Sequence, residues 1–239
     1  MYSNNYNSYG FSPYGNNVQV DKLVTGTMKR VYLKMTMGLI VSALTALFCA
    51  SSNAYLSFYF SHSWLMWLYI ITEFGIVLTL GGAINKLSTL AASALFYVFA
   101  VVNGLMFSSI FLVYSMTAIV KTFFITSATF GAMSVYGYST NRDLSKIGSF
   151  LTMALFGLVI AMLVNIFLHS SALDWIVSIV GVFIFVGLTA WDTQQVKNMV
   201  MIAPAESVGR LATLGALNLY LDFINLFLFL LRIFGGNRD

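Results

Sequence analysis

The chain has 239 residues, of which 59% are hydrophobic and only 8% are charged. Soluble domains are about one quarter charged, so eight acidic and twelve basic residues are too few to cover a surface in water. This composition excludes a water-soluble globular protein and predicts an integral membrane protein. The net charge of +4 does not indicate nucleic-acid binding, because the basic residues are spread along the chain rather than clustered with aromatic ones.

The N-terminal segment is polar, and its Asn, Ser, Tyr and Gly residues show no aliphatic periodicity. We therefore expect residues 1–20 to be disordered. The first apolar run starts too late and is too long for a cleavable signal. Four basic residues precede or open it: Lys22, Lys29, Arg30 and Lys34. We interpret these residues mainly as a signal that sets the orientation of the first span. They also suit contact with anionic lipid.

Seven apolar runs follow, each long enough to cross a bilayer. They span residues 35–59, 64–84, 90–114, 122–138, 148–168, 175–191 and 211–234. Short polar connectors separate them, and none shows the alternation typical of barrel strands. Since lipid excludes unpaired backbone groups, the sequence predicts an all-α domain of seven transmembrane helices over residues 21–236.

The basic residues also predict orientation, because they are enriched on the cytoplasmic side. With the N-terminus cytoplasmic, Lys86 and the basic residues in 142–146 and 197–210 share its face, and the opposite connectors hold only Lys121. Seven spans then place the C-terminus outside, with Arg232 able to snorkel from a helix end. The alternative is that the last segment enters the membrane and returns to the same side without crossing it.

Three acidic residues lie within predicted spans: Glu73, Asp192 and Asp222. A carboxylate at the centre of a membrane helix costs about 2.5 to 3.5 kcal/mol, so such residues usually face a partner, a cavity or an ion path. Glu73 follows Trp64 by nine residues, which places it roughly 14 Å deep. Asp222 also falls near the middle of its span and Asp192 nearer the cytoplasmic end. We expect all three to line one cavity.

Asp192 and Asp222 are the strongest candidates for function, because two acids in consecutive helices are hard to explain as structural groups. If they meet in a low dielectric, they cannot both ionise cheaply and are expected to share one proton. Protonated, they hydrogen-bond across two helices; deprotonated, they repel each other and offer oxygen ligands to calcium. Asn218 and Asn225 flank Asp222 at helical spacing and suit a polar lining. For Glu73, structural and functional roles stay open.

Motifs of soluble enzymes are missing: the chain has no phosphate-binding glycine loop, no HExxH and no CxxC. His62 and His169 fall in connectors, and Cys49 is the only cysteine. We therefore expect no enzymatic activity, no catalytic residue and no cofactor.

Several stretches resemble one known family. AWDTQQVK in the sixth span and LNLYLDFINLFLFLLRIFG in the seventh resemble the signatures of the Bax-inhibitor (transmembrane Bax-inhibitor motif, or LFG) family. TEFGIVLTLGGAINKLS resembles its second span, and YGYSTNRDLSKIGSFL the connector between spans four and five. The likeness covers about residues 20 to 236, and the tight connectors look most like a bacterial inner-membrane member.

The resemblance implies six helices wrapped around the seventh, and a pH-governed calcium leak with the aspartate pair at Asp192 and Asp222. Glu73 corresponds to the family's acid in the second span. In some members a basic residue near the cytoplasmic end of that span helps to latch the closed state, but this chain offers only Lys86, which is slightly displaced and lacks the bidentate fork of arginine. It also lacks the lysine-rich tail of some eukaryotic members.

Three hypotheses follow. The first is a calcium leak, with calcium ions and protons moving through the bilayer under control of Asp192 and Asp222. The second is a non-conducting adaptor that binds membrane proteases or other membrane proteins, for which the N-terminal segment suits docking. The third, a proton-coupled transporter for a small solute, ranks below the leak, because only Gly81 and Gly82 hint at an interrupted helix.

Overall fold

The computed structural model describes residues 13–235, and this part of the chain consists of helices joined by short connectors, with no β-strand. The α-helices are α1 Pro13–Ala50, α2 Asn53–Ser61, α3 Trp64–Gly82, α4 Thr89–Phe107, α5 Ile110–Val113, α6 Met116–Ser139, α7 Ser145–Leu168, α8 Ser171–Ile202 and α9 Val208–Phe234. Two short 3₁₀ helices, η1 (Ile84–Lys86) and η2 (Ala205–Ser207), join neighbours. Seven segments are long and apolar enough to cross a membrane, which confirms the predicted fold class.

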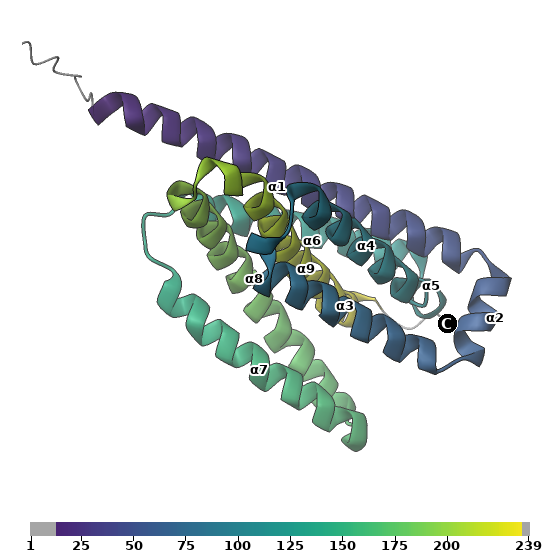
Figure 1. Ribbon diagram of the computed structural model, residues 1–239. Helices are drawn as coiled ribbons and strands as arrows, with labels where there is room; N and C mark the ends of the chain where they lie inside the picture. Colours follow the sequence, from purple (N-terminus) through teal and green to yellow (C-terminus); the bar gives the residue numbers. More distant parts are fainter. Residues whose placement is uncertain (1–12, 236–239) are drawn as a thin grey trace, which may run out of the picture.

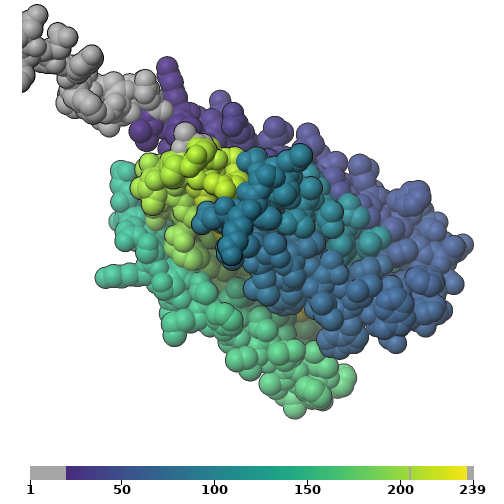
Figure 2. Space-filling view, viewed as in Figure 1, coloured from purple at the N-terminus to yellow at the C-terminus, as the bar shows by residue number. Residues whose placement is uncertain are grey.

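The C-terminal helix α9 is the centre of the bundle and the most buried of the seven spans (Figure 1). It packs against α8, α1, α6 and α4, and touches α3. Helix α7 instead packs against α8 and is the least buried span. In the space-filling view α7 forms an outer ridge at the edge of the molecule (Figure 2).

One face of α9 is fixed by an aromatic and polar cluster at Tyr220, which is fully buried. Its ring meets Phe96 and Phe99 of α4 edge to face, and its hydroxyl lies 2.7 Å from Oγ of Ser42 in α1. Ser42 Oγ donates to the carbonyl of Ala100, 2.6 Å away, so Tyr220 is the donor to Ser42. This cluster holds α1, α4 and α9 together and sets the rotation of α9.

The first span begins and ends earlier than the run 35–59 that hydropathy predicts. Helix α1 already starts at Pro13, so residues 13–20 are helical rather than disordered; residues 1–12 of the predicted disordered segment lie outside the described residues. A helix need not stop at the bilayer surface, because its backbone groups are paired internally. Helix α1 ends at Ala50. Ser52 then caps α2 by accepting a hydrogen bond from the backbone N–H of Tyr55.

Other helix ends also differ from the hydropathy boundaries. Residues 116–121, predicted as a connector, form the start of α6, which Ser115 caps through the N–H of Ala118. The span predicted to end at residue 114 divides into α4 and α5 after Phe107. Helix α8 runs eleven residues beyond the predicted end at 191, to Ile202, so Asp192 lies inside a helix and its side chain has a fixed direction.

Candidate functional site

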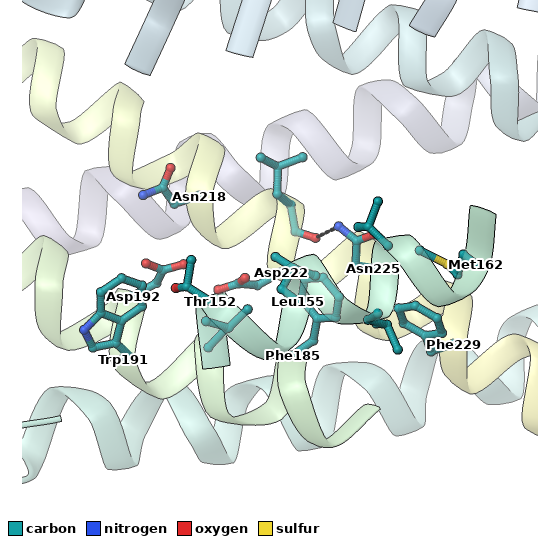
Figure 3. A pocket seen from close by; sticks show the side chains of 14 residues that line it. Thr152, Leu155, Met162, Phe185, Trp191, Asp192, Asn218, Asp222, Asn225 and Phe229 are labelled. Carbon is teal, nitrogen blue, oxygen red and sulfur yellow. Dashed lines mark hydrogen bonds between the residues drawn. The ribbon is translucent and has the colours of Figure 1, made fainter. Parts of the chain in front are cut away.

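A cavity of about 410 Å³ lies between α7, α8 and α9. Its walls are mainly apolar, with a small polar group on each helix. The lining residues are Thr152, Leu155, Leu158, Val159 and Met162 of α7, Phe185, Leu188, Trp191 and Asp192 of α8, and Asn218, Leu221, Asp222, Asn225 and Phe229 of α9. Figure 3 shows this arrangement, with both aspartates among the lining side chains.

Asp192 and Asp222 meet in this cavity. Their carboxyl groups lie within hydrogen-bonding reach of each other, one from α8 and one from α9. Asp222 is only 4% exposed, whereas Asp192 is half-buried. Among residues 13–235, no lysine, arginine or histidine lines the cavity. Two adjacent carboxyl groups without a cation cannot both ionise cheaply, so one proton shared between them is the favoured state.

Neutral oxygen-bearing side chains surround the pair. Asn218 and Asn225 stand one turn on either side of Asp222, on the stripe of α9 that faces α7. Asn225 donates its amide N–H to the carbonyl of Leu221 at 2.8 Å, which leaves its amide oxygen for the cavity (Figure 3). The hydroxyl of Thr152 donates to the carbonyl of Gly148 and can still accept.

Two buried polar atoms at the cavity have no hydrogen-bond partner among the described residues: Oδ2 of Asp222 and Nε1 of Trp191. A buried polar atom without a partner is costly, so these atoms indicate a site that serves a polar or ionic species. Hard cations such as calcium take about six to eight oxygen ligands. Asp192, Asp222, Asn218, Asn225 and Thr152 offer part of that set. Within 13–235, no group of three or more His, Cys, Asp or Glu residues forms a closed metal site.

Glu73 does not join the two aspartates, contrary to our expectation of one cavity for three acids. It is absent from the cavity lining and accepts a hydrogen bond at 2.7 Å from the amide of Asn103, which links α3 to α4. The physical reason is the position of α3, which packs against α4 while the cavity lies between α9 and α7. The hydrogen bond favours a structural role.

Lys86 also lies away from the cavity. It is exposed at the end of η1 and is not a lining residue. The basic side chain that contacts this connector is Arg210 of α9, whose guanidinium donates to the carbonyls of Asn85 and Leu87, at 2.8 and 3.4 Å. Arg210 therefore holds the segment that contains Lys86, and the structure does not place Lys86 as a latch for the aspartate pair.

A second, smaller cavity of about 260 Å³ lies along the same seam between α7, α8 and α9. It shares Met162 with the first cavity and is also lined by Asn165, Asp174 and Arg232. Arg232 and Asp174 form an exposed ion pair at 3.6 Å. The two cavities together run along the seam from the aspartate pair toward the start of α8.

Sequence reasoning missed Thr152 and Trp191 as cavity residues. Trp191 precedes Asp192, and its ring lies so close to Gly148 that a Cβ on that glycine would collide with it. Thr152 follows Gly148 by one helical turn on the same face of α7. A glycine and a threonine one turn apart on one face of a mainly apolar helix are the sequence signal that could have identified this wall of the cavity.

The chain is similar to several bacterial proteins. A family model described as "Inhibitor of apoptosis-promoting Bax1" matches residues 24–239. The inner membrane protein YbhL of Escherichia coli is 47% identical over 214 residues, which cover 88% of this chain and 92% of YbhL. A protein of Borreliella burgdorferi is 44% identical over 89% of this chain and 92% of its own length. One of Caulobacter vibrioides is 37% identical over 93% of each. The chain therefore belongs to the Bax-inhibitor family.

Proposed function

We propose that this protein is a pH-sensitive calcium leak channel, gated by protonation of Asp192 and Asp222. The observation that supports this most is the meeting of two carboxyl groups in a cavity that no basic side chain of the described residues lines. A structural ion pair would include a basic side chain. Two adjacent carboxyl groups without one are instead suited to take up and release a proton.

The gate would work through repulsion. With a shared proton, the two carboxyl groups hydrogen-bond and keep α8 and α9 together. When that proton leaves, two negative charges face each other in an apolar wall and repel strongly. Oxygens of Asp192, Asp222, Asn218 and Asn225 would then be free to bind calcium as it passes. Calcium flux is therefore expected to rise as pH rises.

The path would follow the seam between α7 and α9. Both cavities lie on it, and α7 is the span with the least buried surface. A peripheral helix can shift at a smaller cost in packing than a central one. We propose that movement of α7 relative to α9 opens the seam.

We further propose that the protein lies in a bacterial inner membrane, as the name of YbhL says of that relative. Its N-terminus would be cytoplasmic and its C-terminus outside, because the basic connectors then share the cytoplasmic face.

The test is calcium flux into liposomes that hold the purified protein, with empty liposomes as the control. A flux above the empty liposomes that depends on pH supports the leak. No flux at any pH between 5 and 8 would contradict it and favour an adaptor or a solute transporter. Deletion of residues 1 to 20 separates these outcomes, because a leak survives the deletion, whereas an adaptor that docks through this segment loses its partner.

A further inference from the structure

A groove separate from both cavities at the aspartate seam lies between α1 and α6. Both helices pack against α8 and α9, and a space of about 480 Å³ remains between them. Its lining residues are Thr25, Met28, Lys29 and Tyr32 of α1 and Phe130, Gly131, Ser134, Val135, Tyr138 and Ser139 of α6. A Cβ at Gly131 would meet nothing within 4 Å, so the groove is open at that position.

The groove has a polar end and an apolar end. The two helices run antiparallel here, with Thr25 opposite Tyr138, whose hydroxyls are 3.4 Å apart. Lys29 stands at this end. Phe130 lies two helical turns before Tyr138, or roughly 12 Å along the axis of α6, and forms the apolar end with Tyr32. Charge and apolar surface are therefore separated along the length of the groove.

Ser134 gives the groove an unsatisfied hydroxyl between its two ends. The residue is only 5% exposed, and its Oγ has no hydrogen-bond partner among the described residues. The hydroxyls of Thr126, Ser127, Thr129 and Ser139 in α6 bond to the carbonyl four residues earlier, whereas that of Thr122, outside the groove, lacks a partner within 13–235 as Ser134 does. Since a buried hydroxyl without a partner is costly, Ser134 indicates a ligand that brings a hydrogen-bond acceptor or donor into the groove.

The charge at the polar end is net positive. Lys29 lines the groove, and Lys22 lies about two turns before it on α1, with Asp21 as the acid beside them. Lys197 of α8 adds a further positive charge, because its Nζ lies 4.9 Å from the centre of the Tyr138 ring and donates to the Tyr138 carbonyl at 2.8 Å. Three lysines against one aspartate favour an anionic ligand.

We propose that the groove between α1 and α6 binds one anionic phospholipid of the surrounding leaflet. The phosphate would lie at Lys29, an ester group at Ser134 and an acyl chain along Phe130 and Gly131. This order of charge, hydrogen-bonding group and hydrocarbon matches a glycerophospholipid. A soluble anion would leave the apolar end unused.

The test is native mass spectrometry of the full chain in detergent, with phosphatidylglycerol or phosphatidylcholine added. We expect the wild type to retain phosphatidylglycerol in preference to phosphatidylcholine. Lys29→Gln should weaken phosphatidylglycerol binding about fivefold, the loss expected for one basic residue worth about 1 kcal/mol at an anionic headgroup. Gly131→Leu should weaken it at least as much, because its side chain fills the groove, and Ser134→Ala should weaken it to a smaller extent.

Two matched controls separate the groove from general surface effects. Lys146→Gln removes a lysine exposed elsewhere, and Gly157→Leu adds the same side chain to a glycine of α7 that also has nothing within 4 Å. Both should bind as the wild type does. Equal retention of the two lipids, or groove variants indistinguishable from their controls, would overturn the proposal. Since Lys29 is exposed, Lys29→Gln is expected to fold. This variant therefore tests the proposal even if Gly131→Leu fails to fold.

Discussion

Asp192 and Asp222 are expensive residues for a membrane protein to keep. A carboxylate at the centre of a membrane helix costs about 2.5 to 3.5 kcal/mol on insertion scales, and no basic residue of the described part of the chain lines their cavity to offset such a cost. By contrast, Glu73 has a hydrogen-bond donor in Asn103. The three acids of the spans therefore divide into an acid pair suited to exchange protons and a single acid suited to join two helices.

Infrared spectroscopy can detect the shared proton. We expect the wild type in lipid to show a protonated-carboxyl band near neutral pH that disappears in Asp222→Asn, because the pair then no longer holds two acids. Asp143→Asn is the control. Hydrogen bonds from the hydroxyl and the N–H of Ser145 hold the pKa of exposed Asp143 below its ordinary value. The Asp143 carboxylate is therefore ionised near neutral pH and contributes nothing to the protonated-carboxyl band. A band unaffected by Asp222→Asn would rule out the shared proton.

Glu73 is expected to affect stability rather than pH dependence. Glu73→Gln retains an oxygen that can accept from Asn103, so both fold stability and the pH profile of flux should stay close to the wild type. Glu73→Leu leaves the Asn103 amide without its partner and should cost about 0.6 to 2 kcal/mol, measured by unfolding in mixed micelles. A pH profile altered by Glu73→Gln would return this residue to the gate.

At the scale of elements, α7 forms one wall of the cavity that holds the aspartate pair. It packs against α8 and faces α9 across the cavity. One close approach to α8 is at Gly148, where the backbone lies against the ring of Trp191. That contact sets both the direction of Trp191 and the width of the cavity beside Asp192.

Substitution at Gly148 tests this contact. The Cβ of Gly148→Ala would collide with the Trp191 ring, and overpacking of this kind typically costs about 1 to 3 kcal/mol. We expect a less stable protein and a shifted pH profile of calcium flux. Gly157→Ala is the matched control, because a Cβ on that glycine of the same helix meets nothing within 4 Å. Equal behaviour of the two variants would show that α7 is not seated on Trp191.

At the scale of the whole molecule, hydropathy predicts the seven spans because lipid solvates only apolar surface and leaves no choice but helices. It does not predict helix ends, since a helix can continue past its apolar run, as α1 does before residue 35 and α8 does to Ile202. Depth along each span allows Asp192 and Asp222 to line one cavity without deciding whether they touch, and the structure brings them together in one cavity. The same argument failed for Glu73, because depth says nothing about which side of α9 a helix occupies.

The orientation of the whole molecule is open to a labelling experiment. In a Cys49→Ala background, we expect His62→Cys to react with an impermeant maleimide added outside the cell. Lys146→Cys should react only after the membrane is permeabilised, because the connector that holds Lys146 is basic and is predicted to be cytoplasmic. The reverse pattern would invert the proposed topology while leaving the fold unchanged.

The measurement that tests the central proposal most directly is the pH profile of calcium flux, from pH 5 to 8, for wild type, Asp192→Asn, Asp222→Asn and Asp143→Asn in matched liposomes. Release of the shared proton should open the seam, so wild-type flux and that of Asp143→Asn should rise with pH. Either substitution in the pair should flatten the profile. A pH profile that both Asp192→Asn and Asp222→Asn leave unchanged would contradict the gate.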